Sequence, residues 1–182
     1  MSLQGLVNLV SQSQDVSHVR AAAARGEKLL ALVLSGSQRS LLTAALANDR
    51  AVILFIGYNQ YQVETIGQDL HNLLPNRNIL VFTPHELLPH EEATIDWELR
   101  KSRLEVLKAC RRPGSVICAA VQALSEALPD PDLFFRYQIT IDMDTRVDTE
   151  ALARQLSVMG YERVDMVETF GQFSIRGGII DI

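Results

Sequence analysis

The sequence lacks a run of basic residues, closely spaced cysteines and a long apolar stretch, and each absence excludes a class of protein. Its 182 residues carry 17 Lys and Arg against 22 Asp and Glu, a net charge of −5. This balance argues against a nucleic-acid-binding surface, because contacts with phosphates need clustered positive charge, although a small basic patch remains compatible with it. No apolar run approaches the roughly 20 residues of a transmembrane helix. We therefore predict a cytoplasmic protein that does not contact a membrane.

Cysteine is scarce, and the start of the chain does not have the pattern of a signal peptide. The two cysteines, Cys110 and Cys118, form no CxxC motif and have no histidines at metal-binding spacing. Reduced thiols are the simplest interpretation, with a disulfide as the open alternative. The N-terminus has no basic segment before its apolar residues, so it is no signal peptide. The chain stops within the apolar pattern 178–182, whereas native chains more often end in polar residues, which predicts a fragment of a longer protein.

The first two thirds of the sequence alternate between strand-like and helix-like segments. The strand-like runs are almost continuously apolar, which is typical of strands buried on both faces. Such alternation favours an α/β fold with a parallel sheet covered by helices on both faces. The expected strands are 29–34, 51–57, 79–82 and 115–119, and the expected helices are 41–47, 63–74, 97–110 and 121–128.

From Pro129 onward the pattern changes to that of a smaller unit. Residues 137–141 alternate with a period of two, as a half-exposed strand does. Asp148 or Thr149 can cap a helix that ends at Gly160. The apolar segment 173–182, interrupted by two glycines, predicts a bent strand or hairpin. We expect an α/β domain at 1–128 and a small α+β domain at 129–182.

One loop stands where an α/β nucleotide-binding protein keeps its phosphate loop; it consists of Ser35, Gly36, Ser37, Gln38, Arg39 and Ser40. Aligned with G-x-x-x-x-G-K-[ST], it has Val33 and Gln38 at the glycines and Arg39 at the lysine. A β-branched valine resists the backbone torsions of such a loop, and the planar guanidinium of Arg39 differs from a compact ammonium. No strand ending in paired acids follows. We predict a strand–helix turn, capped by Ser37, that binds no nucleotide.

Two further clusters invite a functional interpretation. The segment 85–92 is rich in His and Glu, but Pro84 and Pro89 break any helix on which two imidazoles could converge, so we predict a solvated loop and no metal site. The segment 160–178 offers two arginines, aromatic residues and glycines, a composition typical of protein interfaces. The alternative, equally favoured by composition, places Phe173 in the core and Arg176 at an edge.

Three segments carry a resemblance to a known family: LSGSQRSLLTAALA (34–47), ELRKSRLEVLKAC (98–110) and GYERVDMVETFGQFSIRGGIIDI (160–182). The last combines Gly-Tyr-x-Arg-x-Asp with Gly-x-Phe-x-x-Arg-Gly-Gly-x-x-Asp. Together they resemble the amino-terminal part of bacterial transcription-repair coupling factors (Mfd), most of all the Firmicute-type members. That part is similar to the excision-repair protein UvrB, and the resemblance covers essentially the whole chain.

The resemblance implies a fold and a function. The implied fold is a RecA-like domain with a degenerate phosphate loop (domain 1a, 1–128) and a truncated α+β domain inserted in it (domain 2, 129–182). The inserted domain would bind UvrA, with Arg163, Arg176 and Phe173 on the binding surface. The whole family protein is an ATP-dependent DNA translocase that displaces stalled RNA polymerase. Its ATP, magnesium, DNA and polymerase sites belong to other domains, so this chain is expected to be a scaffold without catalysis or cofactor.

Two other interpretations stay open. The first is a fragment of a UvrB-type DNA-loading ATPase. It is disfavoured by Gln38 and Arg39 and by the lack of an aromatic-rich hairpin between Thr83 and Trp97. The second is an unrelated doubly wound domain whose C-terminal cluster is only core.

Overall fold

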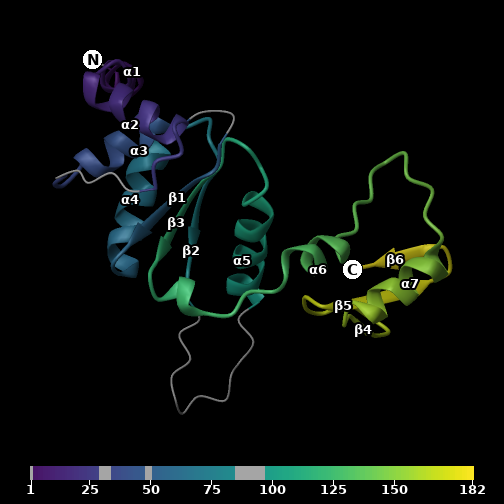
Figure 1. Ribbon diagram of the computed structural model, residues 1–182. Coiled ribbons are helices and arrows are strands. Elements are labelled where there is room, and N and C mark those ends of the chain that lie inside the picture. Colours follow the sequence, from purple (N-terminus) through teal and green to yellow (C-terminus); the bar gives the residue numbers. More distant parts are fainter. Residues whose placement is uncertain (1, 29–33, 48–50, 85–96) are drawn as a thin grey trace, which may run out of the picture. The chain divides into compact units, whose positions relative to one another are not determined.

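A computed structural model describes residues 2–28, 34–47, 51–84 and 97–182. The chain divides into two compact units, Met1–Ala127 and Leu128–Ile182. We refer to them as unit 1 and unit 2 and describe each by itself (Figure 1).

The described residues of unit 1 form a parallel sheet of three strands in the order β1-β3-β2. The strands are β1 (Ile53–Gly57), β2 (Ile79–Phe82) and β3 (Val116–Ala120). Every residue of the central strand β3 is buried. Short parallel strands need crossover connections, which the two intervening helices supply. The predicted α/β class is therefore confirmed.

Helices cover both faces of this sheet, α4 (Gln60–Leu73) on one face and α5 (Trp97–Ala109) on the other (Figure 1). Alternation along β3 divides its side chains between two cores. Val116, Cys118 and Ala120 pack with α4, whereas Ile117 and Ala119 pack in the cluster that holds residues of α5. Both cysteines are free thiols. Burial raises the pKa of Cys118 to about 12.

Three further helices belong to unit 1 and were only partly predicted. They are α1 (Leu3–Ser11), α2 (Gln14–Ala24) and α3 (Gln38–Leu46). Helices α1 and α3 pack beside α4, whereas α2 packs on α1 and α3. Sequence reasoning missed the first two, although serine caps precede both: Ser2 accepts from the Gly5 N–H and Ser13 from the Val16 N–H. The Arg20 guanidinium donates to the carbonyls of Ser11 and Ala45, and so joins the C-terminal ends of α1 and α3.

Two expectations for unit 1 were wrong. Strand β1 is not buried on both faces, because Leu54 and Ile56 are 51% and 54% exposed. Among the described strands β1 lies at one edge of the sheet, and α5 packs against β2, at the opposite edge. The predicted helix 121–128 is reduced to a single 3-10 turn, η1 (Ala123–Ser125). The expected strand 29–34 falls almost wholly outside the described residues.

A buried arginine joins the end of β2 to the segment after η1. Arg103 on α5 is 8% exposed. Its Nη1 donates to the Thr83 carbonyl at 2.6 Å, and its Nη2 lies 2.7 Å from Glu126 Oε2. The guanidinium carbon is 4.2 Å from the centre of the Phe82 ring. Both terminal nitrogens of this cation therefore have an oxygen partner, and an aromatic ring covers one of its faces, as suits a buried charge.

Unit 2 packs one helix on a small mixed sheet, which confirms the predicted α+β arrangement. Its elements are α6 (Pro131–Arg136), α7 (Thr149–Val158), β4 (Glu162–Arg163), β5 (Gln172–Arg176) and β6 (Ile179–Asp181). Strand β5 is parallel to β4 and antiparallel to β6. The predicted cap is present, since Asp148 accepts from two N–H groups of α7. The predicted hairpin turns at Gly177, whose φ of +62° suits glycine.

The segment 137–141 is not the strand that its alternation predicts. Tyr137 serves instead as the C-cap of α6, a helix that Asp130 caps at its start and that was not predicted. Ile139 does pack against the core of unit 2, but Tyr137 and Ile141 are 41% and 47% exposed. Only one of the three alternating apolar side chains therefore turns inward, because alternation does not supply a neighbouring strand with which to pair.

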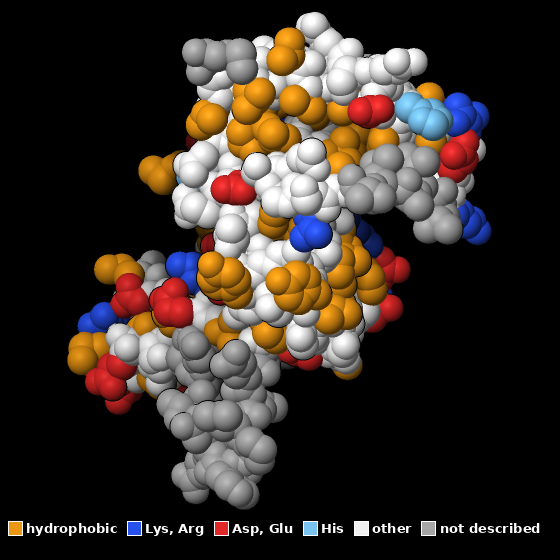
Figure 2. All heavy atoms as spheres, turned by 90° about the vertical axis from the view of Figure 1, so that its left-hand side faces the viewer, with side chains coloured by type: hydrophobic (Ala, Val, Ile, Leu, Met, Phe, Trp, Pro, Cys, Tyr) orange, Lys and Arg blue, Asp and Glu red, His pale blue; other side chains and the backbone are white. Residues whose placement is uncertain are grey.

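None of the described helices combines the length and apolarity that crossing a bilayer needs. Within the described ranges, no three His, Cys, Asp or Glu residues are grouped as metal ligands. The His- and Glu-rich segment 85–92 lies outside those ranges. On the face shown in Figure 2, Lys and Arg side chains are interspersed with acidic ones and do not form a continuous patch.

Candidate functional site

The loop before α3 satisfies its own backbone. The Ser35 N–H donates to Gln38 Oε1 at 2.9 Å, and the Gln38 N–H donates back to the Ser35 carbonyl at 3.1 Å. In a phosphate loop, N–H groups at this position point at the anion. Here a side-chain oxygen takes that place, as in a capping box. Ser37, the predicted cap, makes no side-chain hydrogen bond to the helix.

The residue that matches the phosphate-loop hydroxyl is also occupied. Ser40 is 1% exposed. Its Oγ donates to Asp69 Oδ2 at 2.7 Å and thereby links α3 to α4. In a working loop this hydroxyl binds magnesium. The Ser35 N–H and the Ser40 hydroxyl therefore both form hydrogen bonds within the chain, and these bonds stabilise the fold.

We expect that restoring the Gly-Lys pair of the phosphate-loop motif does not create nucleotide binding. In a Gln38→Gly/Arg39→Lys double variant, Ser40 stays bonded to Asp69, and Val33 still occupies the first glycine position. Titration with a fluorescent ATP analogue plus magnesium should show no saturable binding for the parent chain or the variant up to millimolar concentration. Micromolar affinity in either protein would contradict the structural role assigned to Gln38 and Ser40.

Of the three residues implied in partner binding, Phe173 is placed in the core. It is 0% exposed and packs with Leu152 and Leu156 of α7. The ring of Phe173 therefore packs between the sheet and α7 and is not exposed to a partner. The alternation along β5 is the signal for this, because Phe173 and Ile175 both pack in that core.

Arg163 and Arg176 are both exposed but lie on opposite faces of the small sheet. Arg163 pairs with Phe173 in the parallel ladder, so the two share the face that α7 covers. Arg176 is three residues beyond Phe173 on β5 and so projects from the other face. The structure brings the two arginines to one sheet without bringing them to one surface.

The face of Arg176 carries an ion pair beside an exposed apolar side chain. Arg176 Nη2 lies 2.7 Å from Asp181 Oδ2, and the two side chains are 63% and 43% exposed. Ile179 pairs with Arg176 across the hairpin and is 65% exposed. Ser174, two residues before Arg176 on β5, pairs with Asp181, is buried, and its Oγ donates to the Asp165 carbonyl. We call Arg176, Ile179 and Asp181 the hairpin surface; sequence reasoning had missed Ile179.

A comparison with protein families finds a match in the C-terminal part of the chain. Residues 139–182 match the family described as the UvrB interaction domain. This range includes α7 and strands β4, β5 and β6.

Similarity to curated proteins extends over almost the whole chain. This chain is 36% identical over 184 residues to the transcription-repair-coupling factor of Bacillus subtilis (strain 168). The matched region covers 99% of this chain and 16% of that protein. The protein of the same name from Staphylococcus epidermidis is 27% identical, over 86% of this chain and 14% of its own length. The Staphylococcus aureus (strain bovine RF122 / ET3-1) protein is 21% identical, over 97% and 15%.

The chain thus spans about one sixth of the length of these relatives, as its 16% coverage of the Bacillus protein shows. The family prediction made from 34–47, 98–110 and 160–182 is confirmed. By sequence, this chain is homologous to a segment of the transcription-repair-coupling factors and contains a match to the UvrB interaction domain.

Proposed function

We propose that this chain recruits UvrA on behalf of a transcription-repair coupling factor and has no catalytic activity of its own. The observation that carries the proposal is the UvrB interaction domain match at 139–182, which coincides with the sheet of unit 2. In this proposal unit 1 is the UvrB-like domain with a phosphate loop closed by Gln38. Unit 2 is the start of the UvrA-binding domain. ATP hydrolysis, DNA translocation and contact with RNA polymerase belong to other parts of the cytoplasmic parent protein.

The hairpin surface is the part of unit 2 that we assign to UvrA. A guanidinium can form paired hydrogen bonds with a carboxylate, and Asp181 holds only one nitrogen of Arg176 in the closest contact. Ile179 adds exposed apolar area beside this charge. An arginine next to apolar area is a common anchor at protein interfaces. Arg163, on the other face, would extend the contact if the partner reaches around β4.

We expect Arg176→Glu to weaken capture of UvrA by about 100-fold, because it removes a charge-assisted contact and adds repulsion. Purified UvrA would be titrated onto immobilised chain, and the circular dichroism spectrum of the variant should match that of the parent. Arg163→Glu is tested in the same way.

Arg154→Glu is the matched control. Arg154 lies on α7, its side chain is 71% exposed, and its contact with Glu150 spans 3.8 Å. This reversal should leave the UvrA affinity unchanged. If Arg176→Glu and Arg163→Glu both retain full affinity, the assignment of UvrA to this sheet fails. Binding of damaged duplex DNA by the chain would favour the UvrB-type alternative instead.

A further inference from the structure

Strand β2 lies at an edge of the sheet that the described residues form. Among those residues only β3 pairs with it, and the other side of its backbone has no strand beside it. The Val116 N–H donates to the Asn78 carbonyl, and the parallel register continues through Leu80. In such a ladder alternate residues turn their backbone groups to the neighbouring strand. The N–H and C=O groups of Ile79 and Val81 therefore point to the open edge.

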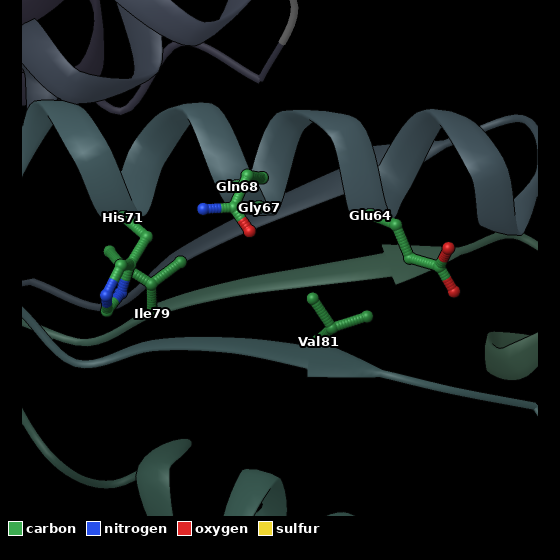
Figure 3. A pocket seen from close by; sticks show the side chains of 6 residues that line it. All are labelled: Glu64, Gly67, Gln68, His71, Ile79 and Val81. Atoms are coloured by element: carbon green, nitrogen blue, oxygen red, sulfur yellow. The ribbon is translucent and has the colours of Figure 1, made fainter.

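A groove of about 400 Å³ runs along the same edge, between β2 and α4 (Figure 3). Its lining residues are Glu64, Gly67, Gln68 and His71 of α4 and Ile79 and Val81 of β2. The two residues with outward-facing backbone groups thus also supply the apolar floor of the groove. An incoming strand would meet hydrogen-bonding groups and side-chain space together.

Gly67 brings the helix close to the strand at the middle of the groove. A Cβ atom at this position would lie 2.9 Å from Cγ2 of Val81, so the wall is bare backbone there. His71 and Glu64 stand towards opposite ends, with His71 near Ile79 (Figure 3). Glu64 is the one carboxylate among the lining residues, and its Oε1 accepts from Gln60 Nε2 at 3.0 Å.

We propose that this groove binds an extended peptide of a partner protein, which adds to the sheet as a strand beside β2. Side chains that point the same way along a strand recur at every second residue. Two apolar side chains at that spacing would cover Ile79 and Val81 beside Gly67, and a Lys or Arg two residues further would face Glu64. Main-chain hydrogen bonds supply affinity in this mode, and the side-chain positions supply selectivity. The proposal concerns unit 1 and does not depend on the UvrA assignment.

Fluorescently labelled peptides test this on the full chain by anisotropy. The probes TVTVTKT and its reversal TKTVTVT present two valines and one lysine on one face, in the two possible strand directions. One of them should bind with micromolar affinity and better than the other. Two versions of the peptide would be N-methylated, one at the even-numbered and one at the odd-numbered backbone nitrogens. Binding should be lost in one version and retained in the other, because only every second N–H of the peptide faces β2.

The Glu64→Lys variant tests the charged end of the groove. It should weaken binding of the lysine peptide by roughly tenfold and favour a peptide with Glu in place of Lys. Glu105→Lys, an exposed reversal on α5, should change neither affinity, and Arg176→Glu should also leave them unchanged.

Three results would overturn the proposal. The first is the absence of saturable binding of either probe, and the second is equal loss of affinity on both methylation patterns. The third is a parent chain that binds no peptide but forms a dimer, where Glu64→Lys abolishes the dimer. That result would assign the edge to a second copy of the chain.

Discussion

Replacing Phe173 with alanine unfolds unit 2 and leaves unit 1 folded. Phe173 is fully buried, and the core around it contains only two other buried residues, Leu152 and Leu156. Truncation of a buried phenylalanine costs about 3–5 kcal/mol. Residues 128–182 form a small unit, and small units bury a smaller share of their surface than large domains do and have less stability to lose. The substitution should therefore consume most of the free energy of unfolding of unit 2.

Hydrogen exchange resolved by residue measures this effect in each unit separately. In Phe173→Ala, the amides of α7 and β5 should lose protection, while those of β3 and α4 keep theirs. The control is Phe173→Leu, which preserves most of the volume and should cost less than about 1.5 kcal/mol. Protection of β5 that survives the alanine substitution would show that the core does not depend on this ring. UvrA capture should be lost together with the fold in Phe173→Ala, but without unfolding in Arg176→Glu.

The second large effect is expected at Arg103. Arg103→Ala should lower the free energy of unfolding of unit 1 by about 3–5 kcal/mol, the usual cost of removing one partner of a buried ion pair. The substitution removes the hydrogen bond to the Thr83 carbonyl, the contact with Glu126 and the cation above the Phe82 ring. Glu126, whose side chain is 27% exposed, loses its arginine.

Denaturant unfolding followed through unit 1 measures the cost at Arg103. Arg112→Ala is the matched control, because Arg112 is exposed and its removal should change stability by less than about 0.5 kcal/mol. Arg103→Met retains apolar volume over Phe82 and should be less damaging than alanine. Equal midpoints for Arg103→Ala and Arg112→Ala would contradict a structural role for the buried pair.

Helix α4, strand β2 and the β5–β6 hairpin could be predicted because each carries a local signal. The apolar spacing from Val63 to Leu74 has the period of a helix, and Gly177 marks the hairpin turn. The exposed face of β1 could not be predicted, since a run of apolar residues does not reveal whether a neighbour covers it. Leu54 reads as core in the sequence and is exposed because α5 packs against β2.

The candidate site shows the same division between local and long-range information. The segment carrying Arg163 and Arg176 could be found from its motif, and the family assignment rested on it. Which faces the two arginines occupy depends on the pairing of β4 with β5, and strand register is a long-range property that a single sequence leaves open. The burial of Phe173 was easier to predict, because Ile175, two positions further along the strand, is also apolar and the two together indicate one inward face.

The turn at Ser35 and Gln38 completes its own hydrogen bonds, so its conformation should not respond to the ATP and ADP concentrations of the cell. A loop that needs a bound anion to complete its hydrogen bonds would order and loosen as ATP and ADP exchange. Here the Gln38 carboxamide and the Ser40–Asp69 bond complete the turn from within the chain. The start of α3 should therefore keep one conformation whatever the nucleotide concentration. Under the function proposed above, this part of the chain would keep one shape while the proposed motor domains of the parent protein pass through their nucleotide cycle.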